Sequence, residues 1–467
     1  MQRPAPFPAY QVPAEPADVV GAPRAAPVLI RGATVMTAAG RTHERGHLLL
    51  IDGKIASVGD GAGAAPAGAL VIDGTGMFVT PGIIDTHSHM GVYPLPASIG
   101  NDDGNEATDA TRPDVWAEHA FWPQDPALTR AIGSGGVTTI QVLPGSANLM
   151  GGRSFTAKLK LGRSAREMRF PGAPQGVKFA CGENPKRNHG GGNGTRMGNV
   201  AGFRKAFQEA HEYRRRWAKH QRDVALWHAK VERTAQRDAA PLDPKADANE
   251  ERDPVDPPDA PARDFELETL ALVLDGKILV HNHCYRADEM SIMLDLAAQY
   301  GFKIRSFHHA LEAYKIRERL AAEDVSTSTW VDWWGFKMES YDGIPQNAAL
   351  LAQAGARAII HSDSESETRH LNQEAAKAMA AGRRAGIALD DNETLRWITA
   401  NPAWALGIDD VTGTLSVGKM ADVVLWDRHP FSVYARPSKV FIDGELVFSR
   451  GEVRQTTDFE IGTGVQP

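Results

Sequence analysis

The sequence predicts an α/β protein in which a mainly parallel sheet occupies most of the chain and both chain ends form β structure. Between about residues 81 and 412, short apolar runs such as GVTTIQVLP, KILVHNHC and ARAIIHSDS alternate with longer helical segments. Strand–helix alternation over this length is typical of a (β/α)8 barrel or of a doubly wound sheet. Both architectures place function at the carboxyl ends of the strands.

The two ends of the chain follow a different pattern, in which short apolar runs are separated by turn dipeptides. Residues 26–80 contain Asp52-Gly53 and Asp73-Gly74, and residues 413–455 contain Asp443-Gly444. Asp-Gly between apolar runs predicts a tight hairpin. We therefore expect a small antiparallel β unit at each end.

Two segments stand outside this scheme. Residues 1–25 are rich in Pro and Ala and predict an extended arm. Residues 204–262 begin as a charged helix and continue as DPKADANEERDPVDPPDAP, which predicts an inserted helix followed by a solvated linker.

Composition narrows the class of protein. The 467 residues are 42% hydrophobic and 23% charged, which excludes a disordered chain and allows a large buried core. A net charge of −7 gives no electrostatic reason to expect nucleic acid as a partner. No stretch approaches the roughly 20 apolar residues that cross a bilayer. The proline-rich start lacks a signal-like apolar core, and two cysteines permit at most one disulfide. We expect a cytoplasmic protein without a membrane partner.

The strongest chemical signal is the run PGIIDTHSHM, which contains His87 and His89. Side chains alternate along a strand with a period of two, so these imidazoles point to one face. Two imidazoles on one face form half of a metal site.

Later strand ends supply further ligands. VHNHC offers His281 and His283 on one face, whereas the neighbours His308 and His309 must face opposite ways, so at most one points into the site. RAIIHSDSE offers Asp363, with His361 on the same face. Separate strands share one site only when the sheet closes around an axis, which favours the (β/α)8 barrel and predicts a metal centre inside it.

One apparent motif is dismissed. Residues 43–47 read His-Glu-Arg-Gly-His, which matches the helical metalloprotease pattern of two histidines one turn apart. Gly46 lies inside the required helix, and the following LLLIDG is typical of a strand that enters a turn.

With these motifs the chain resembles the amidohydrolase superfamily. Within that superfamily it is most similar to the branch that contains imidazolonepropionase-like and prolidase-like enzymes. The resemblance extends from VLIRGATV through VTPGIIDTHSH, GGVTTIQVLPGS and VKFACGENPKR to NPAWALGIDD and GTLSVGKMADVVLWD. It implies a metal-dependent (β/α)8 barrel over residues 81–412 and a small composite β-sandwich made from residues 26–80 and 413–455. By position it implies the metal ligands His87, His89, His281, His309 and Asp363.

The ligand on the fourth strand stays open between two residues. Members of the superfamily use either a carboxylated lysine that bridges two metals or a glutamate, and GVKFACGE contains both Lys178 and Glu183. Their odd spacing places them on opposite faces of a regular strand unless Gly182 breaks the alternation. Glu183 is slightly favoured because it is nearer the mouth, and Lys178 is the alternative.

Two segments are candidates for substrate binding. The glycine-rich loop after Glu183 carries Arg187 and Arg196, which suit a substrate carboxylate. STSTWVDWWGF carries Trp333 and Trp334, which suit an apolar side chain.

The resemblance implies hydrolysis of an amide or peptide bond in a peptide-like substrate, with Asp363 moving the proton and His283 or His361 polarising the carbonyl. One or two divalent ions, with Zn²⁺ favoured, would activate the water. A role in modified-peptide natural-product maturation, similar to that of the bottromycin-pathway amidohydrolase, is a further hypothesis. The alternatives are a cyclic-amide hydrolase or heterocycle deaminase, and a catalytically silent metal-binding interaction module. We expect a small-molecule or peptide partner and a homo-oligomer.

Overall fold

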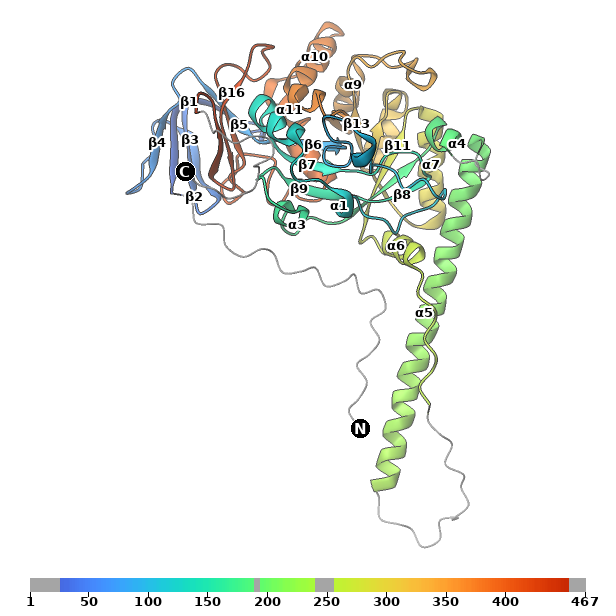
Figure 1. The fold of residues 1–467 in the computed structure, drawn as a ribbon. Helices are drawn as coiled ribbons and strands as arrows, with labels where there is room; N and C mark the ends of the chain where they lie inside the picture. Colours follow the sequence, from blue (N-terminus) through green and yellow to red (C-terminus); the bar gives the residue numbers. More distant parts are fainter. Residues whose placement is uncertain (1–25, 189–193, 240–255, 453–467) are drawn as a thin grey trace, which may run out of the picture.

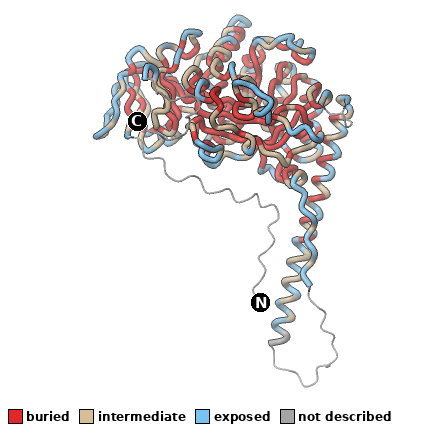
Figure 2. The backbone as a smooth tube through the Cα atoms, in the orientation of Figure 1, coloured by how far each residue is buried: buried red, intermediate tan, exposed pale blue. Residues whose placement is uncertain are grey.

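A computed structural model describes residues 26–188, 194–239 and 256–452. The predicted arm at residues 1–25 and the predicted linker up to residue 255 lie outside these residues. Figure 1 shows two bodies of strands side by side, with helices gathered around the larger one and α5 extending away from both. Buried backbone is concentrated in the strands of the two bodies (Figure 2).

Strands from both ends of the chain pair within one sheet, in the order β17-β16-β15-β5-β1-β2-β3, with β4 also paired to β1. Its N-terminal strands are β1 (Val28–Met36), β2 (Thr42–Ile51), β3 (Lys54–Asp60), β4 (Leu70–Asp73) and β5 (Phe78–Pro81). Its C-terminal strands are β15 (Val423–Trp426), β16 (Pro437–Ile442) and β17 (Glu445–Ser449). The antiparallel pair β5–β15 joins the two ends.

The hairpin predictions for this sheet are correct at two of three places. Asp52-Gly53 and Asp443-Gly444 connect the antiparallel pairs β2–β3 and β16–β17, and all four residues have the positive φ that such a turn requires. The Asp73-Gly74 prediction is wrong, because β4 and β5 both pair parallel to β1 instead of to each other.

The strands that carry the site form two groups. One has the order β6-β7-β9 and the other β14-β13-β12-β11-β10-β8. They are β6 (Ile83–Ser88), β7 (Val137–Val142), β8 (Met150–Arg153), β9 (Phe155–Lys158), β10 (Gly176–Ala180), β11 (Leu279–Cys284), β12 (Ile304–His309), β13 (Ser326–Thr329) and β14 (Arg357–Ile360). Every residue of β6, β7, β10 and β13 is buried, as expected for parallel strands covered on both faces.

The two groups adjoin on both sides. Only Ser154 separates β8 from β9, and each of these strands pairs antiparallel with its neighbour. On the other side the Asp363 amide donates to the His87 carbonyl at 3.0 Å. Within the described residues no strand ladder links β14 to β6, so a closed eight-stranded barrel stays a prediction.

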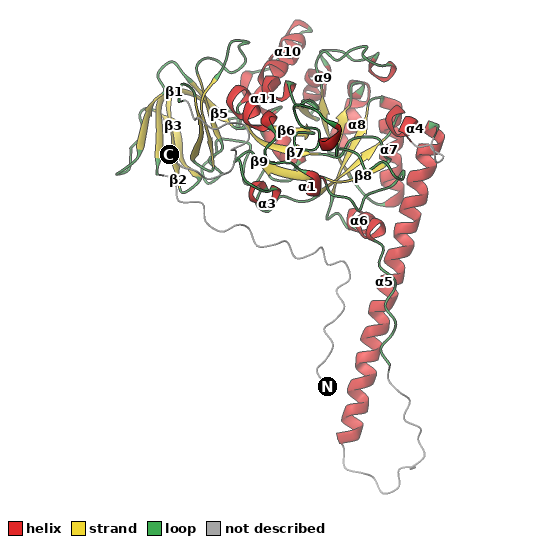
Figure 3. Cartoon of the chain, in the orientation of Figure 1, coloured by secondary structure: helices red, strands yellow, loops and turns green. Residues whose placement is uncertain are grey.

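Helices surround these strands (Figure 3). They are α1 (Ala117–Ala120), α2 (Pro126–Arg130), α3 (Ala165–Met168), α4 (Glu183–Asn188), α5 (Arg196–Ala239), α6 (Phe265–Leu274), α7 (Ala287–Tyr300), α8 (Arg317–Ala322), α9 (Asn347–Gln353), α10 (Leu371–Arg384), α11 (Asp391–Arg396) and α12 (Ala400–Ala405). Shorter helical turns are η1 (Ile99–Asn101), η2 (Ala131–Gly135), η3 (Ala313–Ile316), η4 (Met338–Ser340) and η5 (Glu367–His370). Among the described residues, no helix combines the length and the hydropathy needed to cross a membrane.

The inserted helix is longer than predicted. It begins at Arg196 rather than near residue 204 and runs for 44 residues as α5. Its first half buries Phe203, Phe207, Tyr213 and Trp217, whereas its second half is largely solvent-exposed. The second half therefore takes little part in the core that positions the site.

The two cysteines form a disulfide, Cys181–Cys284, the single bridge that the composition allows. Cys284 ends β11, and Cys181 directly follows β10, whose Ala180 is paired with His283. The disulfide therefore ties together two strands that carry site residues.

Candidate metal centre

The two histidines of the first strand converge on one carboxylate. His87 Nε2 lies 3.2 Å, and His89 Nε2 3.0 Å, from Asp363 Oδ1. His89 Nδ1 is 2.8 Å from the Leu143 carbonyl, which can only accept, so Nδ1 carries a proton and Nε2 is left to face Asp363. A bare nitrogen lone pair and a carboxylate oxygen repel each other at this distance, so either a second proton on Nε2 or a cation between the two atoms is needed. The arrangement therefore fits a bound cation.

A second set of ligand atoms lies around His87. The imidazoles of His87, His309 and His361 each offer one nitrogen, and the three atoms lie within 4.8 Å of one another, as do the atoms offered by His87, His89 and Asp363. His309 and Asp363 have φ values of 71° and 54°, in the left-handed region that non-glycine residues rarely occupy. Strain of this kind is concentrated at functional sites, where the surrounding structure maintains it.

Several buried ring nitrogens have no hydrogen-bond partner in the described part of the chain. They are Nε2 of His281, Nδ1 of His309, and both nitrogens of His283 and of His361. Burial lowers the pKa of His281 and of His361 to about 3, and it lowers the pKa of His283 and of His309 well below the ordinary value. These rings are therefore neutral at pH 7, and neutral imidazole is the form that ligates metals.

Lys178 lies within this cluster, and Glu183 does not. The Lys178 ammonium is buried on β10, 3.1 Å from His87 Nε2, and burial lowers its pKa to about 7. Strand β10 ends at Ala180, and Gly182, at φ 86°, turns the chain so that Glu183 begins α4. The Glu183 carboxylate instead pairs with Arg187 at 3.2 Å and Lys337 at 3.5 Å. The structure thus places Lys178, and not Glu183, beside the histidines, because the chain turns at Gly182; which of the two is the ligand stays a prediction.

Sequence reasoning missed two residues that hold the histidines in place. His308 lies 3.0 Å from His87 through Nδ1 and 3.0 Å from His281 through Nε2, so it orients two rings although it was expected to face away. Asp85 accepts a hydrogen bond from the His87 amide at 3.1 Å, and burial raises its pKa to about 6. Asp85 shares the strand face of His87 and His89, and this period of two was the available signal.

Asp363 is the acid at the centre. Burial disfavours its charge, but in the metal-free protein the hydrogen bond donated by His89 and the positive charge of that ring outweigh burial and hold the pKa of Asp363 below its ordinary value. Asp363 is therefore ionised at pH 7 and can accept a proton.

The charged side chains beside α4 and α5, at the rim of the site, form ion pairs with one another. Arg196 contacts Glu289 at 3.0 Å and also Glu339, and Lys337 is 3.5 Å from Glu339. Together with Glu183 and Arg187, these residues form what we call the rim network. Because Arg196 is already bound to two buried carboxylates, the structure does not support its predicted role in holding a substrate carboxylate.

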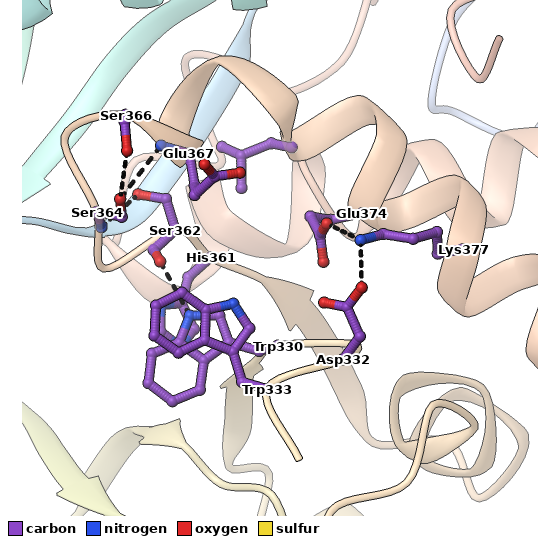
Figure 4. Close-up of a pocket in the computed structure, with 11 residues that line it drawn as sticks. Trp330, Asp332, Trp333, His361, Ser362, Ser364, Ser366, Glu367, Glu374 and Lys377 are labelled. Atoms are coloured by element: carbon purple, nitrogen blue, oxygen red, sulfur yellow. Dashed lines mark hydrogen bonds and ion pairs between the residues drawn. The ribbon is translucent and has the colours of Figure 1, made fainter. Parts of the chain in front are cut away.

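The two tryptophans predicted to bind substrate lie in different places. Trp333 stacks on the buried Trp330 with ring centroids 4.6 Å apart, and both line a pocket with His361 (Figure 4). Trp334 is 61% exposed, contacts Tyr341 and does not line that pocket.

The dismissed His-Glu-x-x-His run lies on β2, so its histidines are not on a helix. His43 pairs with Asp60 at 2.9 Å, and His47 lies 3.0 Å from Ser57.

Comparisons with known proteins agree with this geometry. The amidohydrolase family model matches residues 191–448, more than half of the chain. Amidohydrolase tasK of Hapsidospora irregularis is 33% identical over 422 residues, which cover 87% of this chain but only 39% of tasK. The chain therefore spans about two fifths of the length of that curated relative.

Solved structures give a similar result. An amidohydrolase from Thermotoga maritima MSB8 matches with a TM-score of 0.74 and 31% identity, covering 91% of this chain and all of that one. A zinc-bound adenosine deaminase from Xanthomonas campestris matches with a TM-score of 0.50 and 19% identity, covering 92% of this chain and 94% of that one, which shows a shared fold alone. The chain belongs to the amidohydrolase family.

Proposed function

We propose that the protein is a metal-dependent hydrolase that cleaves an amide bond in a peptide-like substrate. The observation that carries this proposal is the cluster of buried, neutral and unpartnered imidazoles around an ionised Asp363. Buried polar groups without partners are rare in folded proteins, and each calls for an explanation such as a bound ion. Membership of the amidohydrolase family supports the same conclusion.

The residues proposed to hold the ion are His87, His89, His309 and Asp363. His281 completes the set through its Nε2, which has no hydrogen-bond partner among the described residues. Imidazole and carboxylate ligands favour Zn²⁺. Such an ion would lower the pKa of a bound water to about 7 and would polarise the substrate carbonyl.

Lys178 is the proposed ligand of the fourth strand, in place of Glu183. Its lowered pKa of about 7 leaves a substantial fraction of neutral amine at neutral pH. A neutral amine attacks carbon dioxide and loses a proton, which yields a carbamate whose oxygens ligate metals. The nearby His87 Nε2, at 3.1 Å, puts Lys178 where such oxygens would meet the imidazole ligands.

The remaining steps belong to the protein's own side chains. Asp363 accepts a proton from the attacking water and returns one to the leaving nitrogen, as general acid–base catalysis requires. His283 and His361 are buried beside His309, with ring centroids 4.3 Å and 5.1 Å away, and their role is to orient the substrate carbonyl.

The test is a peptide-library cleavage screen by mass spectrometry on metal-replete protein, with metal quantification in the same samples. We expect products that have gained one water at an amide bond. Ammonia release from heterocycles without peptide cleavage would point to a deaminase instead. No turnover of peptides, N-acyl compounds or cyclic amides by metal-replete protein would contradict the proposal and favour an interaction module.

A further inference from the structure

A pocket of about 450 Å³ lies directly beside the proposed catalytic acid. Ser362 and Ser364, the two sequence neighbours of Asp363, line it together with His361. Its other walls come from the loop after β13, from Ser366 and Glu367 at the start of η5, and from the beginning of α10 (Figure 4). Volumes of about 300–1,000 Å³ are typical of pockets for small ligands. A substrate group seated here would lie next to the reacting amide.

The charged side chains that line the pocket are mostly acidic. Three carboxylates, those of Asp332, Glu367 and Glu374, line the pocket with the ammonium of Lys377, and Glu367 lies 3.0 Å from His370 Nδ1. Lys377 contacts Asp332 at 2.6 Å and also Glu374, so its charge is already shared between two acids. The lining therefore has a surplus of negative charge, and a concave surface of one sign attracts ligands of the other.

One of these acids has an unused acceptor. Glu374 has a mostly buried side chain, and its Oε2 has no hydrogen-bond partner among the described residues. His361, which is fully buried, also lines this pocket. A donor that reaches Glu374 Oε2 would satisfy an acceptor that the fold leaves open.

An aromatic surface completes the pocket. Trp330 and Trp333 stack nearly in parallel, with an interplanar angle of 9°, and Phe336 meets Trp333 edge-on at 5.5 Å. Trp330 is buried behind Trp333, which is only partly buried and lines the pocket. The face of an indole ring attracts cations.

We propose that this pocket binds a cationic group of the substrate, a primary ammonium or a guanidinium, and so selects amides that carry a basic side chain near the scissile bond. The inference rests on the proposed hydrolase function and deepens it by naming the substrate class. It replaces the carboxylate anchor expected at Arg187 and Arg196, since those cations are paired within the rim network.

The experiment has a binding arm and a turnover arm, both on the full chain loaded with Zn²⁺. The binding arm measures 1,5-diaminopentane and agmatine by calorimetry, with 1,5-pentanediol as the neutral control. The turnover arm compares peptides that differ only by lysine or norleucine, which have similar apolar stems but differ in charge. We expect binding of both cations but not of the diol, and kcat/KM at least about tenfold higher for lysine, since a charge-assisted hydrogen bond contributes about 1.5–3 kcal/mol.

Three variants locate the site. We expect about tenfold weaker diamine binding from each of Glu374→Gln, Glu367→Gln and Trp333→Leu. The control, Glu318→Gln, makes the same charge change on the exposed face of α8 and should leave diamine binding unchanged. The Glu367 side chain is 45% exposed, so Glu367→Gln should not disturb folding. This variant can still test the site if Glu374→Gln unfolds the protein.

The outcomes separate this inference from the proposed function. Equal turnover of the lysine and norleucine peptides, without diamine binding, would overturn the cationic pocket and leave the hydrolase intact. Diamine binding that survives all three substitutions would overturn the location. Diamine binding that depends on Glu374 and Trp333, in a protein that turns over no amide, would support the pocket while contradicting the proposed function.

Discussion

The metal centre and the rim network are both rich in buried charged or titratable groups, but they satisfy these groups in opposite ways. In the centre, His281, His309 and His361 have buried ring nitrogens that make no hydrogen bond to any described residue. In the rim network, each buried carboxylate has a cation within 3.5 Å, as Glu289 has in Arg196 and Glu183 has in Lys337.

The presence or absence of charged partners indicates which of the two regions binds a ligand. Desolvated polar groups cost free energy unless they are paired. The rim network pairs its charges among its own residues and joins α4 and α5 to the loop after β13, although one oxygen each of Glu183, Glu289 and Glu339 makes no hydrogen bond among the described residues. Under the proposed function the centre is completed by a bound ion, so substitutions should affect metal and turnover there and stability at the rim.

The largest effect should come from the acid of the centre. Asp363→Asn preserves shape but removes the proton acceptor, so kcat should fall by about 10²–10⁴-fold. Metal content should stay close to that of the unmodified protein, because three or more imidazoles remain. Steady-state kinetics and metal quantification on the same preparation test this, and near-normal turnover would refute the role of Asp363.

The next effect concerns metal affinity. His87→Ala removes the ring common to both groups of ligand atoms, so we expect at least about 100-fold weaker metal binding, measured by competition with a chelator. The matched control is His43→Ala, a buried histidine on β2 outside the centre. Equal metal loss in both variants would mean that His87 acts through folding alone.

A third effect is on the pH dependence of stability in metal-free protein. The pKa of Lys178 is about 7 in the folded state and near 10.5 in the unfolded state, so between these values the unfolded chain holds more protons. Its contribution to the free energy of unfolding therefore rises with pH, by up to about 1.4 kcal/mol per pH unit.

Lys178→Met should lack this rise. Urea titrations between about pH 7 and about pH 9 should show the unmodified protein gaining stability relative to the variant, with the difference levelling off below about pH 7. Parallel profiles for the two proteins would show that the Lys178 amine is not desolvated.

The smallest effect belongs to the rim. Arg196→Met leaves Glu289 and Glu339 without their shared cation, and the free energy of unfolding should fall by about 1–3 kcal/mol. Arg187→Met removes a mostly exposed cation and leaves Glu183 paired with Lys337, so it should cost less than about 1 kcal/mol. Denaturant unfolding measures both. A rise in KM for anionic peptides with Arg196→Met, without loss of stability, would restore its predicted role in substrate binding.

The part of the site that lies on strands or just past their ends could be anticipated from the sequence. A period of two puts His281 and His283 on one face of β11 and His87 with His89, which directly follows β6. His361 and Asp363 lie one and three residues past the end of β14. These are local inferences, since they require only the alternation of side chains.

The part of the site that depends on where strands end, and on contacts between residues distant in sequence, could not be predicted. Whether Lys178 or Glu183 faces the histidines depends on where β10 ends and on the turn at Gly182. The engagement of Arg196 depends on Glu289 and Glu339, which are distant in sequence. His308 was expected to face away, but the strand end at His309 adopts a positive φ, which regular alternation does not anticipate.

The most direct test of the central claim is the metal content of two single variants, Lys178→Ala and Glu183→Ala, purified in parallel with bicarbonate and Zn²⁺ present. If the buried centre holds the ion and the rim is structural, Lys178→Ala should lose metal while Glu183→Ala keeps it. Full metal content in Lys178→Ala, together with metal loss in Glu183→Ala, would contradict the account.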